Sequence, residues 1–141
     1  MKPGNSLPES LLKLTLWLLA FYFLLIALAH ITSTKLPLFF VYYSVPSEAY
    51  QDNIISFLSF GWGVFLATAA RDPIQQLNIV RAILVAATGA VAGLSYNNAT
   101  VDFASYSNDI AIWPFWVQTG IIASVTGWLL LLYLAAKRTS V

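Results

Sequence analysis

Long apolar runs separated by short polar segments dominate the chain. The apolar runs cover residues 11–31, 54–70, 77–95 and 112–136. A helix of about 20 mostly apolar residues spans the hydrocarbon core of a bilayer. The pattern therefore predicts an all-α integral membrane protein, with four transmembrane helices in an antiparallel bundle that forms a single domain over residues 1–141.

The polar segments predict where the helices end. In the corner at 71–76, a basic residue suits a helix C-terminus, aspartate is a good N-cap and proline is favoured at the first helical position. Arg71-Asp72-Pro73 therefore predicts a third helix that begins near Pro73 and enters lipid by Leu77. The other connections, 32–53 and 96–111, are longer. Residues 36–45 are dense in aromatics, and we expect them at the interface or over the helix ends.

Two further segments carry local signals. Pro46-Ser47-Glu48 resembles a first helical turn that continues into the second span. Ala27-Leu28-Ala29 resembles a signal-peptidase site. We expect the first span to be retained, because three remaining spans would place the basic C-terminal end against the charge bias described next.

Positive charge is distributed unevenly between the two sides of the predicted bundle. Short cytoplasmic loops carry the excess of lysine and arginine in membrane proteins. One side holds Lys2, Lys13, Arg71, Arg81, Lys137 and Arg138, and the other holds Lys35. The bias predicts that both termini and the corner face the cytoplasm.

Composition excludes several classes of function. The chain is 59% hydrophobic and 9% charged, against about 25% charged residues in soluble domains. A net charge of +1 gives no support for nucleic-acid binding. The sequence has no cysteine, which excludes disulfides, iron–sulfur clusters and thiol chemistry. No catalytic motif and no mid-membrane carboxylate is found, so we expect neither an enzyme nor an ion-coupled transporter.

Small residues recur at helical spacing in three of the spans. In lipid, helices associate through close backbone approach and polar contacts rather than through the hydrophobic effect. Gly89 and Gly93 form a G-x-x-x-G pair. The predicted packing residues are Gly63, Ala67, Ala82, Ala86, Gly89, Gly93, Gly120, Ser124 and Gly127. Contact within one chain and contact with another subunit both remain open.

A few polar and aromatic residues are candidates for ligand contact. Those for an apolar ligand are His30, Trp62, Trp116 and Gln118, and those for a lipid headgroup are Arg71 and Arg81. We expect no metal and no cofactor. The alternative for His30 is a single axial ligand to a haem or pigment, and a bis-His haem within one chain is excluded because the sequence has one histidine. Asn98-Ala99-Thr100 fits the glycosylation pattern, which matters only in a eukaryote.

The segment from Phe65 to Pro73, FLATAARDP, is followed by a polar turn and a third apolar helix. This stretch resembles the BphX-like and DoxX-like groups of small four-span bacterial membrane proteins. The resemblance implies the four-span architecture. Some DoxX-type proteins are small membrane subunits of quinone-linked oxidoreductases, although no catalytic motif of theirs maps onto this chain.

Together these features favour a non-catalytic accessory or structural subunit that packs against a larger membrane complex or against itself. The alternative is a membrane binder, or a small redox-enzyme subunit, that holds a quinone, pigment or lipid between its helices.

Overall fold

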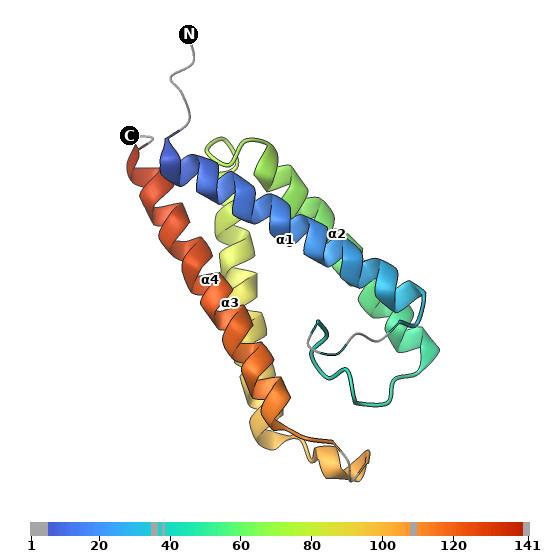
Figure 1. Cartoon of the computed structure of the whole chain (residues 1–141). Helices are drawn as coiled ribbons and strands as arrows, with labels where there is room; N and C mark the ends of the chain where they lie inside the picture. The colour runs from blue at the N-terminus through green and yellow to red at the C-terminus, as the bar shows by residue number, and fades with distance from the viewer. Residues whose placement is uncertain (1–5, 35–36, 38, 108–109, 140–141) are drawn as a thin grey trace.

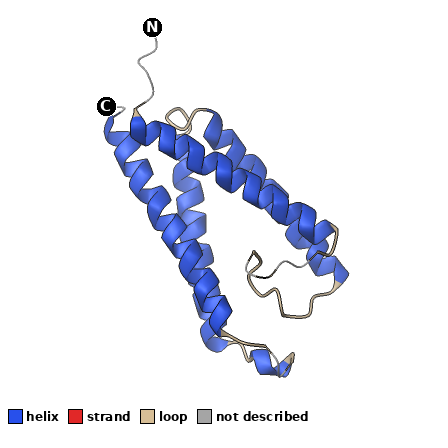
Figure 2. Ribbon diagram, viewed as in Figure 1, coloured by secondary structure: helices blue, strands red, loops and turns tan. Residues whose placement is uncertain are grey.

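The computed structural model describes residues 6–34, 37, 39–107 and 110–139. Its α-helices are α1 (Leu7–Ile31), α2 (Ala49–Arg71), α3 (Leu77–Thr100) and α4 (Trp113–Thr139), and a short 3₁₀ helix, η1, covers Phe103–Ser105. Helices and loops make up the described ranges, which contain no strand (Figure 2). Each of the four α-helices is long and apolar enough to cross a membrane. The all-α architecture with four helices of spanning length is thus confirmed.

The helices pair as two antiparallel hairpins. α1 lies along α2, and α3 lies along α4 (Figure 1). The hairpins meet at the end that holds the start of α1, the corner after α2 and the end of α4, and they diverge toward the opposite end. We call these the closed end and the open end. Lys2 and Lys35, which enter the predicted charge bias, lie outside the described residues.

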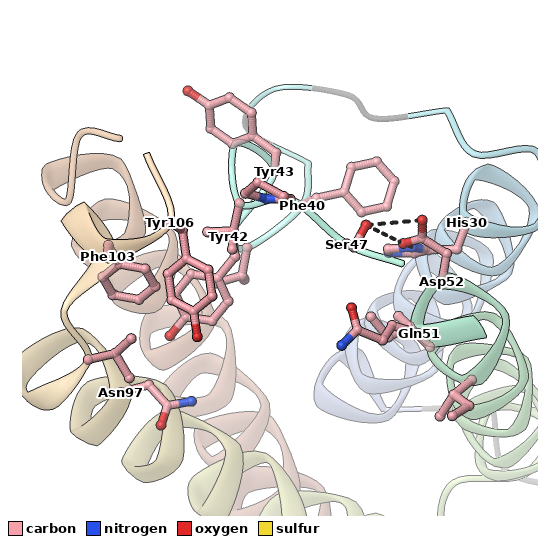
Figure 3. Close-up of a pocket in the computed structure, with 16 residues that line it drawn as sticks. His30, Phe40, Tyr42, Tyr43, Ser47, Gln51, Asp52, Asn97, Phe103 and Tyr106 are labelled. Carbon is pink, nitrogen blue, oxygen red and sulfur yellow. Dashed lines mark hydrogen bonds and ion pairs between the residues drawn. The ribbon is translucent and has the colours of Figure 1, made fainter. Parts of the chain in front are cut away.

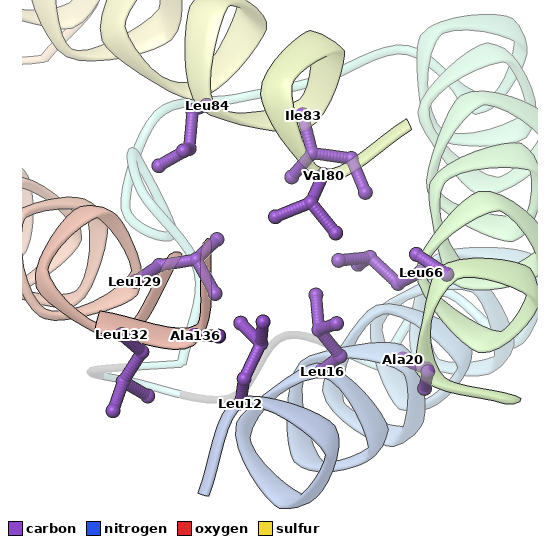
Figure 4. Packing of buried hydrophobic residues seen from close by; sticks show 12 residues of the cluster. Leu12, Leu16, Ala20, Leu66, Val80, Ile83, Leu84, Leu129, Leu132 and Ala136 are labelled. Carbon is purple, nitrogen blue, oxygen red and sulfur yellow. The ribbon is translucent and has the colours of Figure 1, made fainter. Parts of the chain in front are cut away.

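The shared core lies at the closed end. Every helix contributes leucine, isoleucine, valine or alanine at three- or four-residue spacing, which places these residues on one helix face. The cluster consists of Leu12, Leu16, Ala20, Leu66, Ala69, Ala70, Val80, Ile83, Leu84, Leu129, Leu132 and Ala136. Figure 4 shows these side chains converging from all four helices. Large apolar residues such as Phe21, Phe57 and Leu131 are exposed on the outer surface, as expected where lipid is the solvent.

The corner differs in detail from its prediction. α3 begins at Leu77 rather than near Pro73, so that expectation is wrong. Asp72 caps a tight turn instead of the helix: its Oδ1 accepts from Gln75 N at 3.2 Å, and its carbonyl accepts from Gln76 N at 3.0 Å. Pro73 is fully buried in this turn. The chain therefore reverses direction before the next helix starts.

The helices at the open end are longer than the apolar runs. α2 starts at Ala49 with Glu48 as its N-cap, so the prediction that Pro46-Ser47-Glu48 forms its first turn is wrong. α3 continues to Thr100. The polar residues of this extension remain helical because Asn98 is buried with its amide hydrogen-bonded to both sides. Apolar character alone underestimates the length of such helices, because buried polar groups that are hydrogen-bonded are also stable inside a fold.

Among the glycines that the structure describes, Gly63 is the one at which an added Cβ would meet a neighbouring helix. An added Cβ at Gly63 would lie 2.9 Å from Leu24 Cγ and Cδ2 and 3.3 Å from the Ala20 carbonyl oxygen. Ala67 packs against the core. The other predicted packing residues are exposed: Ala82, Ala86, Gly89 and Gly93 on α3, and Gly120, Ser124 and Gly127 on α4. These two stripes therefore face away from the core of their own chain.

We expect Gly63→Val to lower the free energy of unfolding by about 1–3 kcal/mol, because the added methyls must displace Leu24 or the α1 backbone. Gly61→Val on the same helix is the matched control, since an added Cβ there meets nothing within 4 Å. Unfolding of both variants in mixed detergent micelles measures the difference. Equal stability of the two variants would show that α1 and α2 do not pack closely at Gly63.

Candidate ligand-binding site

A cavity of about 520 Å³ lies at the open end, between the diverging hairpins. Its walls come from the end of α1, the loop over residues 40–47, the first turns of α2, the end of α3 and η1. Figure 3 shows the lining side chains in two groups. His30, Ser47, Gln51 and Asp52 lie on the side of α1 and α2, and an aromatic group lies on the side of α3.

Asp52 organises the polar wall. Its side chain is buried, with 6% of the residue exposed. His30 Nδ1 lies 3.0 Å from Asp52 Oδ1, and Ser47 Oγ donates to both carboxylate oxygens at 3.1 Å. An ionised carboxylate only accepts hydrogen bonds, so Nδ1 carries the proton and Nε2 of a neutral His30 is an acceptor. The wall thus holds the imidazole in one tautomer and one orientation.

Three rings pack together on the aromatic side: Tyr42 and Phe103 line the cavity, and Phe115 packs against both of them without lining it. The Tyr42 centroid lies 5.3 Å from that of Phe103 and 4.8 Å from that of Phe115, and the two phenylalanine centroids are 5.1 Å apart. Aromatic pairs at this spacing stabilise by about 0.5–1.5 kcal/mol beyond simple burial. Phe103 and Phe115 are both buried. Phe103 and Tyr42 therefore present a rigid apolar surface to the cavity, and Phe115 supports both rings.

A chain of hydrogen bonds joins the loop to the α3–α4 hairpin. The Tyr42 hydroxyl donates to Asn98 Oδ1 at 2.9 Å, Asn98 Nδ2 donates to Thr119 Oγ1 at 3.0 Å, and Thr119 Oγ1 donates to the Phe115 carbonyl at 2.8 Å. Asn98 is 6% exposed. Its amide is therefore engaged in the fold and is not accessible as a glycan acceptor.

Tyr42 holds an unfavourable backbone conformation at this position. Its φ is +63°, in the left-handed region that costs a non-glycine residue about 1–3 kcal/mol. The hydroxyl bond and the ring contacts offset that cost. Burial raises the pKa of the Tyr42 phenol above its ordinary value, and hydrogen bonding lowers it to a smaller extent. The neutral phenol is therefore the form that the fold stabilises.

Gln118 makes a second link between the loop and α4. Its Nε2 donates to the Phe40 carbonyl at 2.7 Å, and Phe40 packs edge-on against His30 with centroids 4.8 Å apart. Gln118 Oε1 is buried without a partner among the described residues. A buried acceptor left unpaired costs about 1–3 kcal/mol, so a hydrogen-bond donor that reached this oxygen would be strongly favoured.

The structure does not bring all the sequence-predicted ligand residues together. His30 lines the cavity, and Gln118 lies behind Phe40, which also lines it. Trp62 packs against Phe23 at 6.1 Å, away from the cavity lining. Trp116 is exposed on α4. Arg71 and Arg81 are both exposed, and Arg81 lines a different groove.

Sequence analysis missed Ser47, Tyr42 and Asn98 as parts of a site. The aromatic density of residues 36–45 was the available signal for Tyr42, and it indicated an interfacial loop rather than a wall. The bond from Tyr42 to Asn98 joins residues 56 positions apart. Helical or strand periodicity carries no information at that separation.

Comparison with known proteins adds no further constraint: no family model, curated protein or solved structure matches this chain.

We expect Tyr42→Phe to destabilise the chain by about 1 kcal/mol, because it removes one hydrogen bond and leaves Asn98 Oδ1 unpaired in a buried position. Tyr43→Phe is the matched control, since no hydrogen bond to the Tyr43 hydroxyl is found within the described residues. Thermal unfolding in detergent gives the comparison. A larger loss in the Tyr43 variant than in the Tyr42 variant would contradict the anchoring role.

The raised pKa of Tyr42 also predicts a dependence on pH. A folded-state pKa above the unfolded value gives stability that is fully present below about pH 10 and is lost as the pH rises through the folded-state pKa. The stability difference between the wild type and Tyr42→Phe should therefore shrink as the pH rises above about 10. Chemical unfolding at a series of alkaline pH values measures this, and a constant difference would argue against burial of the phenol.

Proposed function

We propose that this chain is a multi-pass membrane protein that binds an amphipathic molecule, with a flat or apolar body and a hydrogen-bonding head, in the open-end cavity. The observation that carries the proposal is the two-sided lining of that cavity: a fixed His30–Asp52–Ser47 network faces an aromatic wall. Ligand pockets in proteins combine a mostly apolar lining with a few fixed polar groups in this way.

The distribution of positive charge favours a cavity that lies at the outer membrane interface. The start of α1, the end of α4 and the corner lie at the closed end, and this end carries Lys13, Arg71, Arg81, Lys137 and Arg138. The positive-inside rule then assigns the closed end to the cytoplasm. The open end lies at the opposite surface, and a bacterial inner membrane is the setting that the charge bias and the four-span resemblance favour.

The divergence of the hairpins gives a ligand lateral access to the open-end cavity. Ile54 and Ile55 line the cavity from the first turns of α2 and are exposed on the helix surface. An apolar molecule in the outer leaflet can therefore reach the cavity laterally without crossing a polar barrier. Its head would meet His30 Nε2, which accepts a hydrogen bond when the ring is neutral. A hydroquinone or another phenolic amphiphile supplies the required O–H donor.

Ile55→Trp tests the cavity, because the larger side chain occupies space that the ligand needs. We expect binding of decylhydroquinone to weaken about tenfold. Leu58→Trp is the control, since Leu58 is exposed on the same helix and lies outside the lining. Isothermal calorimetry in detergent measures both. Equal affinities in the two variants would overturn the placement of the ligand.

The hydrogen-bonding head is tested with a change in the ligand instead of the protein. The dimethyl ether of decylhydroquinone keeps the ring and tail but cannot donate to His30. We expect it to bind about fivefold more weakly to the wild type, the equivalent of one neutral hydrogen bond. Binding of the ether with the same affinity as the hydroquinone would show that the polar wall takes no part in recognition.

A second function, as an accessory subunit, has a separate observation in its favour. The small-residue stripes of α3 and α4 are exposed, and an added Cβ at Gly89, Gly93 or Gly120 meets nothing within 4 Å. Such faces permit close approach of a helix from a larger complex or a second copy.

For this second function we expect native mass measurement in mild detergent to show a partner or a dimer. Gly89→Leu should abolish that association without unfolding the chain, because its side chain has open space on its own subunit. A wild-type chain that is strictly monomeric and free of partners in native membranes would exclude the subunit function.

A further inference from the structure

A second groove lies between α3 and α4 in the half of the molecule nearer the closed end. It has a volume of about 290 Å³ and shares none of its lining with the open-end cavity. We infer that this groove holds one acyl chain of an anionic phospholipid of the cytoplasmic leaflet, with the lipid phosphate at Arg81. The inference rests on the proposed membrane topology and is independent of ligand binding at the open end.

The groove lies within the depth of one leaflet. On α3 its lining runs from Arg81 to Thr88, which are about 6 Å and 17 Å along the helix from Leu77 at 1.5 Å rise per residue. The hydrocarbon core is about 30 Å thick, so its midplane is about 15 Å from either boundary. The groove therefore extends from near the headgroup level to the middle of the bilayer.

The lining of the groove becomes less polar from the closed end toward the middle of the helices. Arg81 and Tyr133 are its polar residues nearest the closed end, and Leu84, Val85 and Leu130 continue it with apolar surface. At the deep end, Thr88 Oγ1 donates to the Leu84 carbonyl at 2.9 Å and Thr126 Oγ1 donates to the Ile122 carbonyl at 2.8 Å. The two hydroxyls are satisfied by their own helices, so the deep end requires no polar partner.

Charge selects the lipid. Within the described ranges, no carboxylate makes an ion pair with Arg81. A guanidinium near the hydrocarbon boundary gains from a phosphate partner, which it can bind with two parallel hydrogen bonds. The Tyr133 hydroxyl is a further donor at the same end of the groove. A net negative headgroup compensates the cation, whereas a zwitterionic headgroup adds a positive charge beside it.

Gly127 keeps the groove open. It lines the groove from α4, and an added Cβ there meets nothing within 4 Å. A leucine at this position would fill the space of the acyl chain without a clash inside the protein. Gly120 lies two turns earlier on α4, also has open space around an added Cβ and does not line the groove. Gly120→Leu is therefore a matched control.

The test is native mass spectrometry of the full chain in detergent, with phosphatidylglycerol or phosphatidylcholine of identical acyl chains. The wild type should retain one phosphatidylglycerol in preference to phosphatidylcholine. Arg81→Gln should weaken phosphatidylglycerol binding about fivefold and remove the preference, while Arg71→Gln, at the exposed end of α2, should leave both unchanged. Arg81→Lys should preserve most of the preference.

Gly127→Leu should abolish retention of both lipids, and Gly120→Leu should not. Decylhydroquinone binding at the open end should be the same in all of these variants, so failure at one site is distinguishable from failure at the other. Equal lipid retention by Gly127→Leu and Gly120→Leu would overturn the groove. Equal loss of the preference for phosphatidylglycerol in the Arg81 and Arg71 variants would show that the lipid is attracted nonspecifically to the positive charge of the closed end.

Discussion

The two helical hairpins share an apolar core at only one end. Leu12, Leu66, Val80 and Leu129 come from four different helices and are all almost completely buried there. The hairpins diverge toward the other end, and the cluster does not extend between them there. Helices in lipid gain little from burying apolar side chains against each other, so divergence costs little wherever lipid or a loop can cover the surfaces. Polar contacts must then hold the open end.

The loop between α1 and α2 provides those contacts. Tyr42 reaches Asn98 on α3, and the Phe40 carbonyl accepts from Gln118 on α4. Ser56 Oγ of α2 donates to the Ala27 carbonyl of α1 at 2.8 Å, which joins the first hairpin internally. Each of these bonds is worth more where water does not compete for the donors and acceptors. The positive φ of Tyr42 shows that the loop accepts local strain in order to make them.

The sequence was sufficient to predict the four helices, because an apolar run of spanning length has few alternatives in a bilayer. It also predicted the corner at Arg71, although the start of α3 lies at Leu77 and not near Pro73. It could not identify the core. A stripe of small residues such as Ala82 to Gly93 indicates a face that permits close approach, but it does not indicate which helix approaches it. The leucines that form the core occur in spans where almost every position is apolar, so their burial has no distinctive pattern.

The candidate site was even less accessible to prediction. His30 was identified because it is the sole histidine, whereas its partner Asp52 was not among the predicted site residues. Burial of Asp52 depends on where α1 ends relative to the start of α2. The close approach of the two helices at Gly63 and the bond from Ser56 to the Ala27 carbonyl both occur in this register, and a sequence pattern within one helix does not reveal it.

The open-end cavity and the groove between α3 and α4 have a common physical origin. Both follow from the register of α1 on α2 and from the divergence of the two hairpins. A straight bundle with equal contacts along all four helices would bury the α3–α4 face on one side and close the open end. Here α1 and α2 pack mainly on each other, and α4 is contacted by α1 near the closed end, where Thr15 Oγ1 accepts a 3.3 Å hydrogen bond from Trp128 Nε1. The α3–α4 hairpin is therefore left partly uncovered. Its open-end surface is covered by an aromatic loop, while its closed-end groove stays uncovered. With the topology proposed above, helix geometry alone would place these two surfaces at different depths of the membrane.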